Sequence, residues 1–308
     1  MKIDAARQFQ PTEDLVQGIL SAYNLRLINF ESAESGIENC TLFVATSDGD
    51  YVLRVYRKEK KSDNDIAAEL EFVEYLADHD IPVALAIKNS VGECLTKYKG
   101  WQSILMRKIS GKHETSYDSA LVESLSVTQA KMHRLALEYR GTSPSKQPVS
   151  FLQDEIFLPE VDVAALNPTA QLLIGRAVDY TVMLPEGLPS GLCHLDYDID
   201  NILVNEQHQI TAVLDFDDLT PAPFVVCLSY ALWDIMSCGQ IDFAGDYLAT
   251  YSLHRELTGA ELELIPAIML FRHYMVASII VLDGVMDQNR AEKYVRIENS
   301  ILNWRATV

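Results

Sequence analysis

The chain has 308 residues, of which 48% are hydrophobic, and this content is enough for one large or two modest cores. It has no run of 18 or more apolar residues and no apolar signal-peptide core near its start, so we expect neither a membrane span nor an export signal. The net charge of −19 argues against nucleic acid as a partner, because a phosphate backbone attracts basic proteins.

The first hundred residues favour β-strands with one helix inserted after the third strand. Asp48-Gly49, a strong hairpin signal, lies between two of the strands, and apolar residues at helical spacing predict a helix over residues 65–78. The predicted strands cover residues 24–30, 39–45, 52–56, 94–97 and 101–106.

Ser110-Gly111 follows the last of these strands and is expected to act as a pivot. Helical patterns dominate the remainder of the chain, except for a short β-rich block at residues 192–214. The predicted helices cover residues 120–139, 170–182, 226–235, 243–253 and 259–284. These patterns predict an α+β protein with a small β-rich lobe and a larger, mainly helical lobe.

The β-rich block contains the most informative motif, a His-x-Asp-x-x-x-x-Asn pattern formed by His194, Asp196 and Asn201. In phosphoryl transfer such an aspartate orients the acceptor hydroxyl or accepts its proton. The spacing to Asn201 fits a loop that turns back so that the amide oxygen meets a metal ion. A chance match in a polar turn is the alternative, and the flanking strands argue against it.

A second acidic unit, Asp215-Phe216-Asp217, ends the following apolar strand. Mg²⁺ prefers oxygen ligands and also binds phosphate oxygens, so Asn201 and Asp215 suffice as its protein ligands. Asp217 is a possible auxiliary ligand. We expect Asp198 and Asp200 to be solvated loop carboxylates, with metal or substrate binding as the alternative.

In the first half, strand alternation places Arg54 on the same face as Val52 and Tyr56. An inward-facing arginine needs a carboxylate or a phosphate, and Glu69 is its expected partner, with Glu71 second. The alternative is a solvent-facing Arg54.

The loop at residues 32–39 is expected to cover the nucleotide phosphates. The backbone amides of Ser35 and Gly36 can reach phosphate oxygens there, although a single glycine makes this a weak glycine-rich signal.

On these motifs the chain resembles the aminoglycoside phosphotransferase and choline kinase superfamily, whose members share the bilobal protein-kinase fold. A weaker similarity in residues 251–258 points to the homoserine kinase-like branch. The matching segments cover most of the chain: residues 36–39, 51–54, 69–76, 81–83, 105–111, 194–204 and 214–217.

The resemblance implies a nucleotide-binding lobe at residues 1–107 and a catalytic, substrate-binding lobe at residues 108–308. It implies ATP and Mg²⁺ as cofactors, Asp196 with His194 as catalytic residues, and Asn201 with Asp215 as metal ligands. Nucleotide binding is implied for residues of the first lobe and the hinge: Arg54, Glu69, Ser35, Gly36, Leu105, Met106 and Lys108.

Two departures from the family pattern concern the catalytic loop. Leu195 stands where the family usually has glycine, and Cys227 stands where it usually has an aspartate that braces the loop. They leave two hypotheses open: an active small-molecule kinase, or a catalytically degenerate protein that binds nucleotide or ligand. A protein kinase is the weaker third hypothesis, since no Ala-Pro-Glu segment follows Asp215.

Charge and cysteine content bear on the acceptor and the location. Residues 151–308 carry 23 Asp or Glu against 7 Lys or Arg, which tilts the expected alcohol acceptor toward a cationic one, with a plain acidic surface as the alternative. The acceptor classes left open are aminoglycosides, choline or ethanolamine, homoserine and sugars.

The five cysteines lack zinc-like spacing and predict reduced thiols in a cytoplasmic protein. The sequence does not indicate the oligomeric state.

Overall fold

The computed structural model describes residues 11–33, 39–56, 61–146, 149, 151–153, 163–178 and 180–306. The chain packs into two compact units. The first comprises Met1–Gly111, Arg140–Ser145 and Thr211–Leu214, and the second comprises Lys112–Tyr139, Lys146–Ile210 and Asp215–Val308.

The first unit thus extends beyond residue 107 and takes in two later segments of the chain. Hydrogen bonds explain both additions. The Val213 amide donates to the Pro82 carbonyl at 2.7 Å, and the Ser145 amide donates to the Asp65 carboxylate at the same distance.

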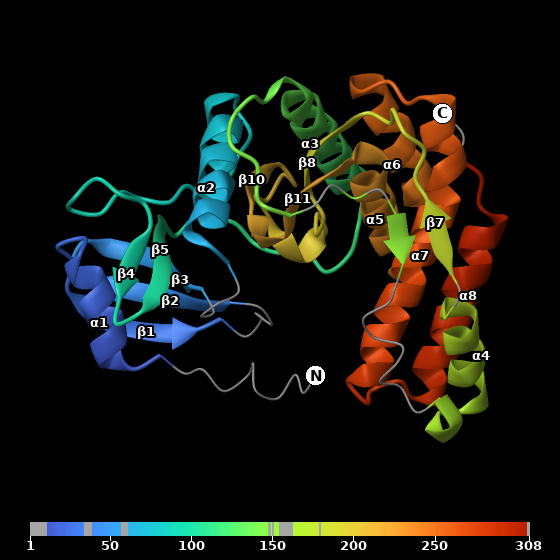
Figure 1. Ribbon diagram of the computed structural model, residues 1–308, viewed down its shortest axis with the longest axis horizontal. Helices are drawn as coiled ribbons and strands as arrows, with labels where there is room; N and C mark the ends of the chain where they lie inside the picture. Colours follow the sequence, from blue (N-terminus) through green and yellow to red (C-terminus); the bar gives the residue numbers. More distant parts are fainter. Residues whose placement is uncertain are drawn as a thin grey trace. The chain divides into compact units, whose positions relative to one another are not determined.

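The first unit is built on a five-stranded antiparallel sheet with strand order β1-β2-β3-β5-β4 (Figure 1). All five strands predicted from the sequence are present, with ends shifted by no more than three residues. Their bounds are β1 Leu27–Ser32, β2 Cys40–Thr46, β3 Gly49–Val55, β4 Thr96–Tyr98 and β5 Trp101–Arg107.

The hairpin between β2 and β3 turns at the predicted Asp48-Gly49 pair. Gly49 has a φ of +120°, a conformation that L-residues rarely adopt. The Thr46 hydroxyl closes the turn by accepting from the Asp48 amide at 3.1 Å and donating to the Gly49 carbonyl at 2.9 Å.

The described residues of the first unit form two helices, α1 (Glu13–Ser21) and α2 (Asp63–Asp78), so the expectation of a single helix is corrected. Helix α1 begins at Thr12, whose hydroxyl accepts from the Leu15 amide. Its buried residues recur at helical spacing, and this signal could have revealed it: Leu15, Val16, Ile19 and Leu20.

The two helices cover opposite faces of the sheet. Leu53 and Val55 of β3 belong to the hydrophobic cluster that contains the buried face of α1. Val52 and Tyr56, on the alternate face, pack in the cluster that contains Ile66 of α2. The predicted alternation along β3 is therefore present, and it places Arg54 on the face covered by α2.

The second unit is mainly helical (Figure 1). Within the described residues, the five helices predicted for it are present, although the helix predicted for residues 170–182 ends at Ala177. A sixth, α8, was missed, although its buried residues recur at helical spacing: Ala291, Tyr294, Ile297 and Ile301. The bounds are α3 Ser119–Glu138, α4 Pro168–Ala177, α5 Phe224–Ser237, α6 Ile241–His254, α7 Gly259–Leu282 and α8 Gln288–Asn303.

Short strands and 3₁₀ turns connect these helices. Strand β8 (Ser190–His194) pairs antiparallel with β11 (Leu219–Pro223), and β6 (Phe151–Gln153) pairs with β7 (Thr181–Met183). The remaining short elements are η3 Val163–Ala165, η4 Ile199–Asn201, β9 Ile202–Val204, β10 Ile210–Val213 and η5 Phe216–Asp218.

Helix α7 is long and apolar enough to cross a membrane by length and composition alone. Within the structure, 56% of its most apolar window is buried, as in the core helix of a folded domain.

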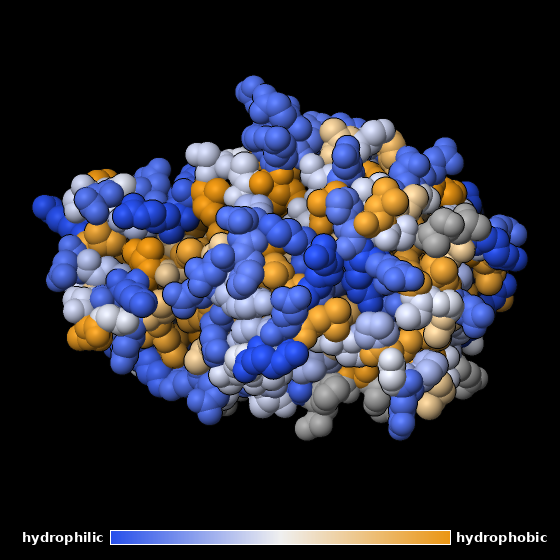
Figure 2. Space-filling view, turned by 90° about the horizontal axis from the view of Figure 1, so that it is seen from above, coloured by the Kyte–Doolittle hydropathy of each residue, from blue (hydrophilic) through white to orange (hydrophobic). Residues whose placement is uncertain are grey.

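On the face drawn in Figure 2, hydrophobic side chains lie interspersed among hydrophilic ones. Single exposed apolar residues of this kind are ordinary on protein surfaces.

Candidate active site

The motif lies at the end of β8, where the pairing with β11 fixes the chain before it enters the loop. His194 is opposite Leu219 in this ladder and is only 2% exposed. Its ring centroid lies 4.7 Å from that of Phe216, and its Nδ1 accepts from the Asp196 amide at 3.3 Å. This geometry gives His194 a positioning contact with the loop.

Asp196 is the partly exposed carboxylate of the motif, with 40% of its side chain accessible. The Asn201 side-chain amide donates to the Asp196 carbonyl at 2.9 Å and to Asp196 Oδ2 at 3.0 Å. The predicted five-residue turn therefore brings the two motif residues into direct contact. The Asn201 amide nitrogen faces Asp196, so the amide oxygen faces away and can bind a cation.

Asp198 corrects the expectation of a solvated loop carboxylate. It is half-buried, and its carboxylate caps η4 by accepting from the amides of Asp200 at 3.0 Å and Asn201 at 3.3 Å. Burial, followed by the charges of Asp196, Asp234 and Asp200, raises the pKa of Asp198 to about 8. Asp200 is exposed, as predicted.

Asp215 follows β10 in a left-handed conformation, with a φ of 57°. This conformation costs an L-residue roughly 1–2 kcal/mol, and such local strain is typical of functional positions. The carboxylate caps η5 by accepting from the Asp217 amide at 3.3 Å. Asp217 itself is 7% exposed.

The donor chemistry of Asn201 and Asp215 fits Mg²⁺, because both present hard oxygen atoms. Within the described residues, no group of three His, Cys, Asp or Glu side chains could hold a metal ion. A metal bound here therefore needs further oxygen ligands, which nucleotide phosphates and water supply.

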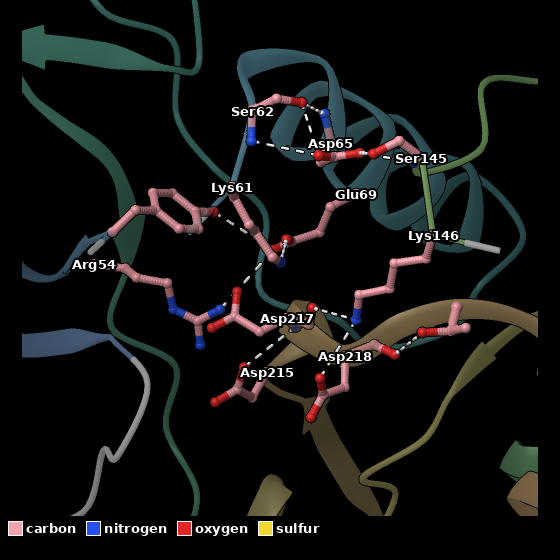
Figure 3. A network of polar contacts seen from close by, with 12 residues as sticks. Arg54, Lys61, Ser62, Asp65, Glu69, Ser145, Lys146, Asp215, Asp217 and Asp218 are labelled. Carbon is pink, nitrogen blue, oxygen red and sulfur yellow. Dashed lines mark hydrogen bonds and ion pairs between the residues drawn. The ribbon is translucent and has the colours of Figure 1, made fainter. Parts of the chain in front are cut away.

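Lys146 lies beside the acidic segment that follows Asp215 (Figure 3). Its Nζ is 3.5 Å from the Asp217 carbonyl and 3.4 Å from Asp218 Oδ1. The sequence analysis missed this lysine.

Arg272 is a second residue that the sequence analysis missed. Its Nη2 donates to Asp196 Oδ1 at 3.1 Å from the middle of α7. Its guanidinium lies over two aromatic rings of α5, at 4.7 Å from the Tyr230 centroid and 5.8 Å from the Trp233 centroid. A lone arginine in an otherwise apolar helical run was the available signal.

Cys227, expected to weaken the loop, lies against it. The thiol is 1% exposed on α5, and its Sγ donates to the His194 carbonyl at 2.9 Å. Gln129 Nε2 lies 3.4 Å from both the carbonyl and the Sγ of Cys227. Cys227 thus contacts the end of β8, from which the loop bearing Asp196 follows.

In the first unit, Arg54 Nη1 lies 3.9 Å from Glu69 Oε1, so the predicted pair is present (Figure 3). Lys61, another residue that the sequence analysis missed, lies closer, with its Nζ 2.6 Å from Glu69 Oε2. Both Arg54 and Glu69 are buried. Glu71, the second candidate, instead accepts from the Thr142 amide at 3.3 Å.

The other predicted nucleotide contacts differ in what the structure shows of them. Ser35 and Gly36 lie outside the described residues. The Leu105 side chain is fully buried in the sheet core, and its carbonyl accepts from the Ile87 amide at 2.8 Å. Met106 is 9% exposed, and the Lys108 amide donates to the Asp50 carbonyl at 3.2 Å.

Comparison with known proteins matches residues 29–262 to a family described as the phosphotransferase enzyme family. The homoserine kinase of Polaromonas naphthalenivorans is 27% identical over 253 residues, which cover 79% of this chain and 78% of that protein. The homoserine kinase of a Caulobacter species is 25% identical over 261 residues, covering 83% and 81%.

Solved structures are also similar. An amicoumacin kinase in complex with AMP-PNP and Ca²⁺ has a TM-score of 0.71 at 17% identity, over 98% of this chain and 96% of that one. The choline kinase LicA of Streptococcus pneumoniae has a TM-score of 0.61 at 12% identity, over 95% and 99%. At these identities the likeness shows the fold, and the expected bilobal, protein-kinase-like α+β class is confirmed.

Proposed function

Because this chain belongs to the phosphotransferase enzyme family, it is an ATP-dependent kinase that phosphorylates a small-molecule hydroxyl, and we propose that its acceptor carries an ammonium group. Homoserine is the first acceptor to test, since homoserine kinases recur among the curated relatives. The carboxylates of Asp200 and Asp234 near Asp196 support a cationic group on the acceptor.

One observation carries the assignment of the catalytic residue. Asp196 is the partly exposed carboxylate after the end of β8, and the Asn201 side-chain amide donates one hydrogen bond to this carboxylate and one to the Asp196 backbone carbonyl. A carboxylate fixed in this way can accept a hydrogen bond from the acceptor hydroxyl and receive its proton during transfer. The His194 ring positions the loop by accepting a hydrogen bond from the Asp196 amide, and it does not need to transfer a proton.

Phosphoryl transfer requires little covalent chemistry from the protein, so positioning and charge neutralisation carry the mechanism. We assign Asn201 and Asp215 as ligands of Mg²⁺, which when bound neutralises the phosphate charge. Arg54, held by Glu69, is assigned to the nucleotide phosphates, with Lys61 as a second cation beside the same carboxylate.

The remaining nucleotide-binding residues are assigned from the sequence. Ser35 and Gly36 stay predictions for the phosphate loop, and Met106 and Lys108 stay predictions for adenine binding. A contact of Leu105 with the base would have to come from its backbone, because its side chain is part of the core. The cytoplasmic location also stays a prediction, in keeping with five cysteines that form no disulfide.

Leu195 and Cys227 motivate the catalytically degenerate alternative. The motive from Cys227 is weakened, because its thiol donates to the His194 carbonyl. Asp196, Asn201 and Asp215 together also supply the side chains that turnover requires.

The experiment is to measure ADP release with Mg²⁺ and ATP across a panel of homoserine, choline, ethanolamine, 3-aminopropan-1-ol, an aminoglycoside and a sugar without an amine. Asp196→Asn should lower kcat for the best acceptor about 10²- to 10⁴-fold while ATP still binds, as measured by calorimetry. Asp246→Asn, an exposed change on α6, is the matched control. Equal activity in the Asp196 variant would reject the assigned role, and turnover only of sugars without an amine would reject the acceptor class.

A further inference from the structure

Arg272 is the only Asp, Glu, Lys or Arg between Leu264 and Leu282 of α7. Its side chain is 19% exposed, and a cation so largely removed from water must be paired. The contact from Nη2 to Asp196 Oδ1 pairs only part of the guanidinium. Its Nε atom is buried and has no hydrogen-bond partner among the described residues. A buried donor left without a partner is costly and calls for an explanation.

The guanidinium is also held in a fixed plane. Tyr230 and Trp233 of α5 both face it, at centroid distances of 4.7 and 5.8 Å. Nε and Nη2 lie on the same edge of an arginine, and that edge binds a carboxylate through two parallel hydrogen bonds. In this structure Asp196 accepts from one donor of this edge, Nη2, through a single oxygen, so the pairing is not bidentate and the buried Nε does not take part in it.

Replacing Asp196 by an acceptor carboxylate as the partner of Arg272 would also free Asp196 for the acceptor hydroxyl. A carboxylate that is paired with Arg272 is less available to a hydroxyl, because both compete for its oxygen atoms. An acceptor that carries its own carboxylate can replace Asp196 as the partner of the Arg272 guanidinium and leave Asp196 Oδ1 for the hydroxyl. In homoserine four bonds separate the hydroxyl oxygen from the carboxyl carbon, a reach of about 5 Å. This reach suits two groups whose facing atoms are 3.1 Å apart.

The surrounding charges suit the other end of such a molecule. Asp234 of α5 accepts a hydrogen bond from the Tyr117 hydroxyl. It also lies close enough to Arg272, Asp196 and Asp200 for their charges to act on it. A cation beside several carboxylates complements a zwitterion, whose ammonium and carboxylate lie one carbon apart. A simple amino alcohol has no carboxylate to replace Asp196 as the partner of Arg272.

We propose that Arg272 is the specificity-determining residue that binds the carboxylate of the acceptor, so that the acceptor is a hydroxy α-amino acid rather than a simple amino alcohol. This proposal rests on the proposed kinase function and narrows its acceptor class.

The test compares two acceptors that differ only in the carboxylate, L-homoserine and 3-aminopropan-1-ol. The wild-type protein should prefer homoserine in kcat/KM. Arg272→Gln should lower kcat/KM for homoserine about 30- to 1,000-fold, the range for removing one partner of a buried charge pair. It should change the value for 3-aminopropan-1-ol less than threefold, and the KM for ATP should stay constant. Arg272→Lys keeps the charge without the planar fork and should be intermediate.

Arg296→Gln, an exposed change on α8, is the matched control and should behave as the wild type with both acceptors. If Arg272→Gln proves unstable, the wild-type protein still decides the matter with homoserinamide, whose neutral amide should lower kcat/KM at least tenfold relative to homoserine.

Three results would overturn the proposal: equal losses with both acceptors, a raised KM for ATP in Arg272→Gln, or equal wild-type use of 3-aminopropan-1-ol and homoserine. The last result would leave the kinase function intact. Failure of every acceptor in the panel would instead remove the proposed function, so the two failures are distinguishable.

Discussion

At the scale of single residues, Cys227 links α5 to the catalytic loop through its Sγ contact with the His194 carbonyl. Cys227→Ala removes the donor and leaves a small void, so we expect the free energy of unfolding to fall by about 1–3 kcal/mol. Because the loop bearing Asp196 loses a restraint, kcat should fall several-fold while KM for ATP changes little. Urea denaturation and steady-state kinetics measure the two effects.

Two further variants separate positioning from simple stability. Cys227→Ser keeps a donor at the same place and should recover most of kcat. Cys238→Ala removes an exposed cysteine from the end of the same helix and should leave both quantities unchanged. A Cys227→Ala protein that is destabilised but turns over normally would show that the thiol serves packing alone.

The sequence could group those candidate residues that lie near one another along the chain. Asp196, Asn201 and Asp215 carry carboxylate and amide side chains at short spacing in the sequence. In the structure the Asn201 side chain is hydrogen-bonded to Asp196. Arg272 lies 76 residues from Asp196, so only the packing of α7 places it there. Cys227 was judged by the aspartate it replaces, since sequence alone cannot show that a thiol reaches the same loop.

At the scale of elements, α2 begins with a capping box that also binds another part of its unit (Figure 3). Ser62 and Asp65 cap each other, and Asp65 Oδ1 accepts from the amide and the hydroxyl of Ser145, each at 2.7 Å. The Ser145 backbone amide is the main cause that lowers the pKa of Asp65 to about 2. One carboxylate thus holds the helix start and the segment Arg140–Ser145.

The lowered pKa of Asp65 predicts the direction of a pH effect. The unfolded chain has an Asp pKa near 3.9, so below about pH 4 it binds a proton that the folded protein resists until about pH 2. The stabilisation is therefore present above pH 4 and is lost as the pH falls from about 4 to about 2. Asp65→Asn should lower stability by about 1 kcal/mol at pH 7, a value reduced for solvent screening, and the difference from wild type should shrink toward pH 3.

Urea midpoints at pH 7, 5, 4 and 3 test this expectation, with Glu74→Gln on the exposed middle of α2 as control. A difference between Asp65→Asn and wild type that stays constant across this range would mean that the cap works without its charge.

At the scale of the whole molecule, nearly all of the net charge of −19 belongs to residues 151–308, which carry −16. Such a field attracts a cation at long range but has little net effect on a zwitterion. The acidic second half therefore favoured a cationic acceptor in the sequence analysis, whereas Arg272 favours a zwitterion. The field and the arginine predict different salt dependences for two acceptors, and this difference can be measured.

Raising the salt concentration from 20 mM to 0.5 M shortens the screening length from about 20 Å to about 4 Å. We expect kcat/KM for the cation 3-aminopropan-1-ol to fall about 3- to 10-fold over this range. At high salt the field of the acidic residues 151–308 is screened and no longer raises the local concentration of this cation. For homoserine, whose net charge is near zero at pH 7, we expect a change of less than twofold. Saturating ATP and Mg²⁺ at every salt concentration keeps nucleotide binding out of the measurement. Equal salt dependence for the two acceptors would mean that the acidic surface plays no part in drawing an acceptor to Asp196.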